Sequence, residues 1–102
     1  MGFVYLISND YNHYKIGITT KTVEKRIKQL QTGNSEKINL VKYYKTEHHR
    51  NLEAWLHRKF GANRLEGEWF DLDDAVVLDF ENICKSLEST IILLKEQNPF
   101  YN

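Results

Sequence analysis

Two extended segments followed by a helical one constrain the fold of this chain more than any other feature. Residues 3–7 and 14–18 are rich in β-branched and aromatic side chains, and the Asn-Asp-Tyr-Asn run at 9–12 is typical of a turn. This pattern predicts a hairpin. Apolar residues at helical spacing over 22–31, with Gly33 behind them, predict a helix directly after the hairpin.

A third strand and a second helix are predicted next. Residues 38–45 have extended character, and a later run of apolar residues at helical spacing stops at Gly61. The Glu-Trp-Phe run at 68–70 predicts a short extended piece after a loop.

The last third of the chain predicts one long helix. Asp71 or Asp73 would cap its start and Pro99 would end it. Its apolar face consists of Val76, Phe80, Ile83, Leu87, Ile91 and Leu94. We therefore expect an α+β fold with a small antiparallel three-stranded sheet flanked by helices, in the order β-β-α-β-α, plus this C-terminal helix. Residues 1–72 would form the core, and 73–102 would pack on the core or on a partner.

The length of 102 residues favours a single domain, because two cores of half that size would each be too small to fold by packing alone. The sequence has no apolar run of the roughly 18 residues that a membrane span needs, and its opening apolar run is too short for a signal peptide. We therefore expect a cytoplasmic protein with no membrane partner. The one cysteine, Cys84, excludes an internal disulfide and is expected in the core.

Charge is divided unequally along the chain although the formal net charge is zero. Residues 1–64 carry twelve Lys or Arg and five Asp or Glu, a balance of +7, whereas residues 65–102 carry two and nine, a balance of −7. A basic segment followed by an acidic one favours a polyanion-binding surface with an acidic structural or self-pairing tail. The alternative is that this unequal distribution is ordinary variation among the charged residues of a protein surface.

Strand alternation places Lys15, Gly17 and Thr19 on the face opposite Tyr14. Tyr5 of the first strand would then neighbour Lys15. An ammonium beside a phenol favours the phenolate, so the pair could supply a general base. The alternative is a packed tyrosine with a solvated lysine.

Arg26 lies on the inward side of the first predicted helix, three residues after Val23 and four before Leu30. A guanidinium at the edge of a core needs a partner, and a phosphate matches its planar donor fork. The alternative is an ion pair with a carboxylate such as Glu53. The lysines around it are phosphate contacts or plain surface residues: Lys21, Lys25 and Lys28.

His49, Glu53 and His57 recur every four residues, so neighbours in this series lie one above the other on the second predicted helix. A zinc site would need more His or Cys ligands, whereas one carboxylate with water and a substrate phosphate is how Mg²⁺ is usually held. Magnesium therefore fits better than zinc. The alternative is a hydrated helix face with a Glu-His ion pair.

Taken together, these residues resemble the GIY-YIG nuclease family in order and spacing. The matching segments are Phe3-Val4-Tyr5, Lys15-Ile16-Gly17, Gly17-Ile18-Thr19, Glu24-Lys25-Arg26-Ile27, Leu30-Gln31-Thr32-Gly33-Asn34, Leu52-Glu53, Leu56-His57, Phe60, Arg64 and Gly67-Glu68-Trp69-Phe70. The later segments are similar to a phage and bacterial subgroup of that family. Phe3 departs from the first motif's glycine, and Lys15 occupies the second motif's tyrosine position. Asn63 or Arg64 stands near the family's late asparagine.

The resemblance implies an endonuclease that hydrolyses DNA phosphodiester bonds with one Mg²⁺ or Mn²⁺ ion. Tyr5 would be the general base, assisted by Lys15, and Arg26 would bind the scissile phosphate. Glu53 would hold the ion, and His57 would be a neighbouring proton donor. Contacts to nucleic acid are expected from Lys21, Lys25, Lys28 and Arg64.

Two other functions remain open at this level. The first is a nucleic-acid-binding module of the same fold with weak or no catalysis, and it is suggested by Lys15 in the position of a tyrosine. The apolar run at 91–94 motivates a protein-interaction module, including a homodimer through the C-terminal helix. Whether a DNA target would be single- or double-stranded, and whether cutting is sequence-specific, does not follow from the sequence.

Overall fold

The computed structural model describes residues 1–98 of the chain and begins with the predicted hairpin. Strand β1 (Gly2–Ser8) pairs antiparallel with β2 (Tyr14–Thr19). In the turn between them, the side-chain oxygen of Asn9 accepts hydrogen bonds from the backbone N–H of Tyr11 and His13, both at 3.0 Å. Asn12 adopts a φ of 58°, a left-handed conformation that asparagine tolerates better than most residues. The turn chemistry of this segment therefore closes the hairpin as expected.

The sheet has three antiparallel strands in the order β2-β1-β3, which confirms the predicted α+β fold. Strand β3 (Asn39–Thr46) pairs with β1, and the register shifts between Leu6 and Ile7. Strand β1 is therefore central, and β2 and β3 are the edge strands, with the outer side of β2 bridged only at Tyr14 by Phe70 among the described residues.

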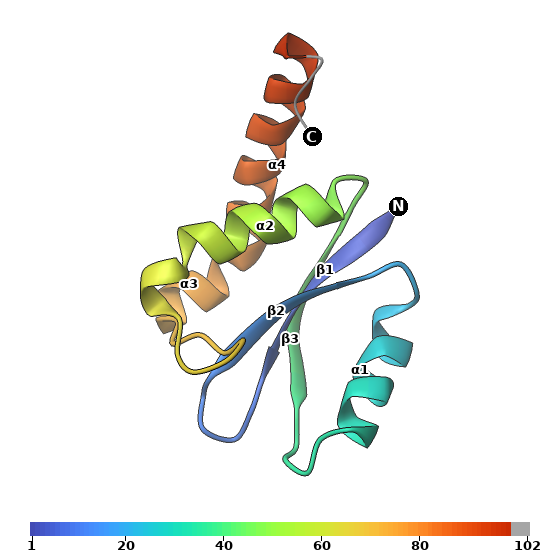
Figure 1. Cartoon of the computed structure of the whole chain (residues 1–102), viewed down its shortest axis with the longest axis vertical. Helices are drawn as coiled ribbons and strands as arrows, with labels where there is room; N and C mark the ends of the chain where they lie inside the picture. The colour runs from blue at the N-terminus through green and yellow to red at the C-terminus, as the bar shows by residue number, and fades with distance from the viewer. Residues whose placement is uncertain (99–102) are drawn as a thin grey trace.

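Helix α1 (Val23–Thr32) covers one face of the sheet (Figure 1). The side chain of Thr22 caps its start by accepting the N–H of Lys25 at 3.4 Å, and Gly33 follows its end. The cluster under this helix consists of Tyr5, Ile7, Val23 and Ile38, with Phe3, Ile27, Leu30 and Trp69 packed against it.

The other face carries the larger core, under α2 (His49–Lys59) and α4 (Phe80–Gln97) (Figure 1). Between these helices lie the short 3-10 helix η1 (Gly61–Asn63) and helix α3 (Asp74–Leu78). The side chains that pack closely here include Val4, Leu6, Ile16, Leu52, Leu56, Phe70, Phe80, Cys84 and Ile91. Residues on both sides of position 72 share this one core, and Cys84 is fully buried in it as expected.

The predicted long C-terminal helix is present as α4, but it begins at Phe80, and the segment before it forms a separate short helix. The chain forms α3 and α4 with a break at Asp79, whose backbone leaves the helical conformation at φ −94° and ψ 8°. Aspartate is a weak helix former, and the bend brings both Val77 and Phe80 into the core while Leu78 stays 76% exposed. Asp73, one of the two expected caps, is at the N-cap position of α3, but its side chain forms no capping hydrogen bond. The expected end at Pro99 lies outside the described residues.

The far half of α4 extends beyond the sheet (Figure 1). Ile91 is completely buried against the core, whereas Ile92 and Leu93 are exposed. The helix therefore packs on its own domain on one side and keeps an apolar strip on the other. None of the helices within residues 1–98 is long and apolar enough to cross a membrane.

Candidate functional site

Tyr5 lies across the edge strand β2 because residue 17 is a glycine. The two residues are paired partners, and the phenol hydroxyl of Tyr5 is the nearest atom to the place where a side chain on Gly17 would begin. Any Cβ there would collide with the ring. Tyr5 is only 2% exposed, so the phenol is held firmly in the α1-side cluster with its hydroxyl at β2.

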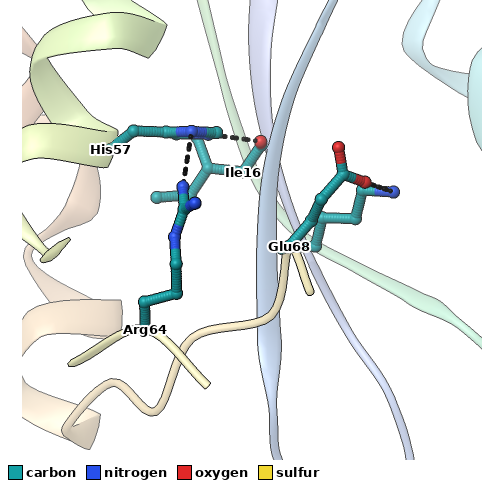
Figure 2. Close-up of polar contacts among 5 residues, drawn as sticks. Ile16, His57, Arg64 and Glu68 are labelled. Carbon is teal, nitrogen blue, oxygen red and sulfur yellow. Dashed lines mark hydrogen bonds and ion pairs between the residues drawn. The ribbon is translucent and has the colours of Figure 1, made fainter. Parts of the chain in front are cut away.

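Lys15 lies on the same face of β2 and forms an ion pair. Its ammonium is 2.8 Å from a carboxylate oxygen of Glu68, a contact drawn in Figure 2. The hydrogen bond and the positive charge of Lys15 lower the pKa of Glu68. Glu68 was not among the residues assigned a role from the sequence. It reaches β2 because Phe70 pairs through its backbone with Tyr14, at 2.7 and 2.9 Å.

His57 projects from α2 to the outer side of β2, where both of its ring nitrogens are engaged (Figure 2). Nε2 is 3.0 Å from the carbonyl oxygen of Ile16, and Nδ1 is 3.4 Å from Nη2 of Arg64. A carbonyl can only accept and a guanidinium can only donate, so the proton is on Nε2 and the lone pair on Nδ1. The rings of His57 and Phe70 also meet edge to face at 5.4 Å. This arrangement holds the imidazole in one tautomer and one orientation.

Glu53 lies one helical turn before His57 and is half-buried. Its side chain forms no hydrogen bond or ion pair with another residue of the described range 1–98. Burial raises the pKa of Glu53, the nearby His57 opposes this effect, and the negative Glu68 adds to it. A carboxylate in this position gains from any cation that comes to it.

Arg26 is half-buried at the start of α1 and lines a pocket together with Ile18 and Thr19 of β2. Its Nε atom is buried and has no hydrogen-bond partner among residues 1–98. The alternative of an ion pair with Glu53 does not occur, because the only ion pair in the described part of the chain joins Lys15 and Glu68. The guanidinium therefore lacks the acceptor that a buried donor normally has.

The other basic residues expected to contact nucleic acid are exposed. Lys21, Lys25 and Lys28 line a shallow hollow along α1, and the guanidinium of Arg64 stacks at 5.3 Å from the ring centre of Phe70. The backbone carbonyl of Asn63 accepts the N–H of Asp71 at 2.8 Å, which fixes the loop after η1. These contacts do not identify either Asn63 or Arg64 as the counterpart of the asparagine that the resemblance implied near this position.

Several of the side chains described above contact or face strand β2. Successive residues of β2 contact Glu68 at Lys15, His57 at Ile16 and Tyr5 at Gly17, and then face the pocket of Arg26. Tyr5 reaches β2 from the α1 face of the sheet, whereas the helix that bears Glu53 and His57 covers the opposite face. Tyr5, Lys15, His57 and Arg26 therefore lie along β2, and Glu53 lies on α2 one helical turn before His57.

Comparison with known proteins corrects the family suggested by the short motifs. The family model that matches the chain is the T5orf172 domain, over residues 2–85, and no GIY-YIG family model matches. The assignment to the GIY-YIG family is therefore wrong. It rested on segments of one to five residues, and the departures at Phe3 and Lys15 fall in two of them.

No curated protein and no solved structure matches the chain. The T5orf172 domain is a nuclease-like, DNA-binding type of domain, which is compatible with an interaction between this chain and nucleic acid. The matched region includes the whole sheet, α1, α2 and every residue of the β2 edge described above. On this match the chain belongs to the T5orf172 domain family.

Proposed function

We propose that this protein is an endonuclease that hydrolyses DNA phosphodiester bonds with one divalent metal ion, at the outer edge of β2. The observation that carries this proposal is the half-buried carboxylate of Glu53, which has no hydrogen-bond partner in residues 1–98. The buried and unpartnered Nε of Arg26 supports it, because that atom needs an acceptor. A carboxylate that needs a cation and a guanidinium that needs an anion suit a metal ion and a phosphate.

The residues present fit a magnesium or manganese ion better than a metal held entirely by protein. Residues 1–98 contain no group of three or more His, Cys, Asp or Glu that could hold a metal ion. Glu53 alone would hold the ion, with water and phosphate oxygens completing the coordination, as is usual for Mg²⁺. When bound, the ion would supply charge neutralisation on the phosphate oxygens.

Arg26 would bind the scissile phosphate. Its guanidinium donates two parallel hydrogen bonds to phosphate oxygens and stabilises the negative charge that develops on them during hydrolysis. Its position on the inward side of α1 limits the conformations it can adopt, so little entropy is lost when the phosphate binds.

Tyr5 would accept the proton of the attacking water. Its hydroxyl is held at Gly17 by the pairing of β1 and β2, and Lys15 adds a positive charge two residues away on the same strand. His57 would position the edge of β2 through Ile16 and Arg64, because both of its ring nitrogens are already engaged.

The test is cleavage of plasmid DNA and of single- and double-stranded oligonucleotides by the full chain, with Mg²⁺, with Mn²⁺ and with a chelator. Cleavage should need the ion, and Arg26→Ala and Glu53→Ala should each lower the rate by about 10²-fold or more. Arg58→Ala and Glu24→Ala are matched controls, because both residues are exposed helix positions away from the β2 edge. Unchanged cleavage in both site variants would refute the proposal.

A second candidate is a DNA-binding module of this fold with weak or no catalysis. It is favoured by the 2% exposure of Tyr5 and by the ion pair that engages Lys15. This candidate predicts binding without cutting. The affinity would fall steeply with salt, because phosphate contacts release counterions, and a chelator would leave it unchanged.

A homodimer through α4 is a further prediction for this protein. Ile92 and Leu93 provide an exposed apolar strip on the part of α4 that extends beyond the sheet. Sedimentation equilibrium at high protein concentration tests it, and a species that stays monomeric throughout would contradict it.

A further inference from the structure

A pocket of about 270 Å³ lies where β2 ends and the chain turns into α1. The first turn of α2 contributes to its wall, so an element distant in sequence meets the consecutive elements β2 and α1 there. We call it the basic pocket and define it by Lys21, Arg26, His49 and Arg50. Of these four residues, only Lys21 and Arg26 have so far been given a role.

The basic pocket contains positive charge that nothing in the described chain neutralises. Lys21, Arg26 and Arg50 are cations, and none of the residues lining the pocket is acidic. None of these three cations forms an ion pair with another residue of 1–98. A concave site with charge of one sign attracts counter-ions of the other sign, so this pocket attracts anions.

Two of the residues that line this pocket carry buried nitrogen atoms without partners. These atoms are Nε of Arg26 and Nδ1 of His49, and these are the two buried side-chain polar atoms that are unpaired within residues 1–98. Buried polar groups are almost always hydrogen-bonded, so each unpaired atom needs an explanation. Nε of Arg26 can only donate, and therefore its missing partner is an acceptor.

The position of His49 is fixed by a close approach to β1. A Cβ on Gly2 would lie 2.7 Å from Cγ and Nδ1 of the imidazole, so only a glycine leaves room for this ring. Burial lowers the pKa of His49, and the positive amino terminus and Arg50 lower it further. The imidazole thus lies in a confined and electropositive place.

We propose that the basic pocket binds a phosphate group of a nucleic acid strand, with Arg50 and His49 of α2 joining Lys21 and Arg26. Its volume is slightly below the range of about 300–1,000 Å³ that is typical of small-molecule sites, which suits a small anion. The planar guanidinium groups of Arg26 and Arg50 match the oxygens of a phosphate. As a site for DNA it rests on the proposed function, whereas phosphate binding itself does not.

The first experiment titrates the full chain with inorganic phosphate, without divalent ions and without DNA, against sodium chloride of equal ionic strength. Amide and arginine Nε–H signals are followed by nuclear magnetic resonance. We expect saturable shifts at residues 19–21 and 49–50 and at Nε of Arg26. Arg50→Gln should weaken phosphate binding roughly tenfold, because a charge-assisted hydrogen bond is lost.

Arg58→Gln is the matched control, because Arg58 is an exposed arginine on the same helix outside this pocket, and it should leave binding unchanged. Lys21→Gln provides a second variant on another element and should also weaken binding. Shifts that do not saturate, or equal weakening by Arg50→Gln and Arg58→Gln, would overturn the proposal. This experiment measures no cleavage, so it tests phosphate binding separately from nuclease activity. If the protein binds phosphate but does not cut DNA, the proposal for the basic pocket stands and only the proposed nuclease activity is refuted.

The second experiment identifies which phosphate of a strand occupies the pocket. Wild type and Arg50→Gln are compared for binding to one oligonucleotide with and without a 5′-phosphate. A larger loss for the phosphorylated strand supports a terminal phosphate, and an equal loss for both supports a backbone phosphate. No loss for either strand would overturn the assignment of the pocket to nucleic acid.

Discussion

Two glutamates, Glu53 on α2 and Glu88 on α4, are both half-buried on the same side of the sheet but have opposite surroundings. Glu88 accepts a hydrogen bond from the hydroxyl of Tyr44 at 2.8 Å and another from the hydroxyl of Thr46. Glu53 has no hydrogen bond from any residue in the described range. One carboxylate is therefore satisfied by its own protein, and the other is not.

The same contrast extends to the two edges of the sheet. Near the β3 edge, the ammonium of Lys95 donates to Nδ1 of His48 at 3.1 Å, so that side is held by paired polar groups. Near the end of β2, Arg26 keeps a buried nitrogen without a partner, and so does His49, whose ring lies against Gly2 of the central strand β1. Unpaired buried polar groups cost stability, and a phosphate bound at the basic pocket, as proposed above, would offset that cost.

The sharpest test of this contrast is Glu53→Gln. We expect cleavage of DNA to fall by about 10²-fold or more, because a neutral amide no longer attracts the metal ion. Stability should stay equal or rise, since the burial of a charge is relieved. Cleavage rates and urea unfolding of the same preparation measure both effects. A loss of stability without a loss of cleavage would place Glu53 with the structural residues.

Glu88→Gln should show the reverse pattern. The amide replaces a charged acceptor of two hydroxyl hydrogen bonds, so unfolding free energy should fall by about 1–3 kcal/mol. Cleavage per folded molecule should remain as in the wild type. Urea unfolding measures the change, with Glu96→Gln on the exposed side of α4 as the control. Equal stability of the two variants would contradict the structural role of Glu88.

A smaller effect is expected from alkaline pH. Burial and the hydrogen bond to Glu88 raise the pKa of Tyr44 from its ordinary value of 10.0 to about 12. Because the folded state holds this proton more tightly than the unfolded state, the contribution is complete below pH 10 and is lost as pH rises toward 12. Stability of the wild type should therefore fall more over this interval than stability of Tyr44→Phe. Parallel curves for the two proteins would show that Tyr44 is not perturbed.

The smallest effect concerns the ion pair of Lys15 and Glu68. Lys15 lowers the pKa of Glu68, so the stabilisation is present above the ordinary value of 4.5 and disappears as pH falls through the folded-state pKa. Glu68 is largely exposed and Lys15 partly so, and solvent screens the pair, so its coupling energy should be below about 1 kcal/mol at neutral pH. A double-mutant cycle with Lys15→Met and Glu68→Gln, at pH 7 and pH 3, measures it. A coupling energy that persists at pH 3 would contradict this assignment.

Much of the fold could be predicted from local pattern. The alternation in β2 correctly separated Tyr14 and Ile16 from Lys15 and Gly17, and Thr22 and Gly33 correctly bounded α1. These predictions depend on side-chain period and capping, which are properties of a few neighbouring residues. The break at Asp79 was not predicted, because the same apolar spacing fits one straight helix or two helices at an angle. Only packing against the sheet distinguishes them.

The candidate site was less predictable for the same reason. Glu68 lies in one of the matching short segments but was given no role, and Arg50 had no local signal, since a helix arginine is ordinary on any surface. The family was also misassigned, because short strand motifs with a tyrosine and a glycine resemble those of more than one family.

The sequence by itself determined the elements and the side of each strand, because hydrophobic period and turn chemistry act over short distances. Only the tertiary structure decided that Glu88 finds two hydroxyl partners while Glu53 and Arg26 find none, and that α2 completes a basic pocket at the end of β2. Whether a buried polar group is satisfied depends on residues about 40 positions away in the chain, as Tyr44 and Glu88 show. Such pairings arise from packing of the whole domain and not from any local pattern.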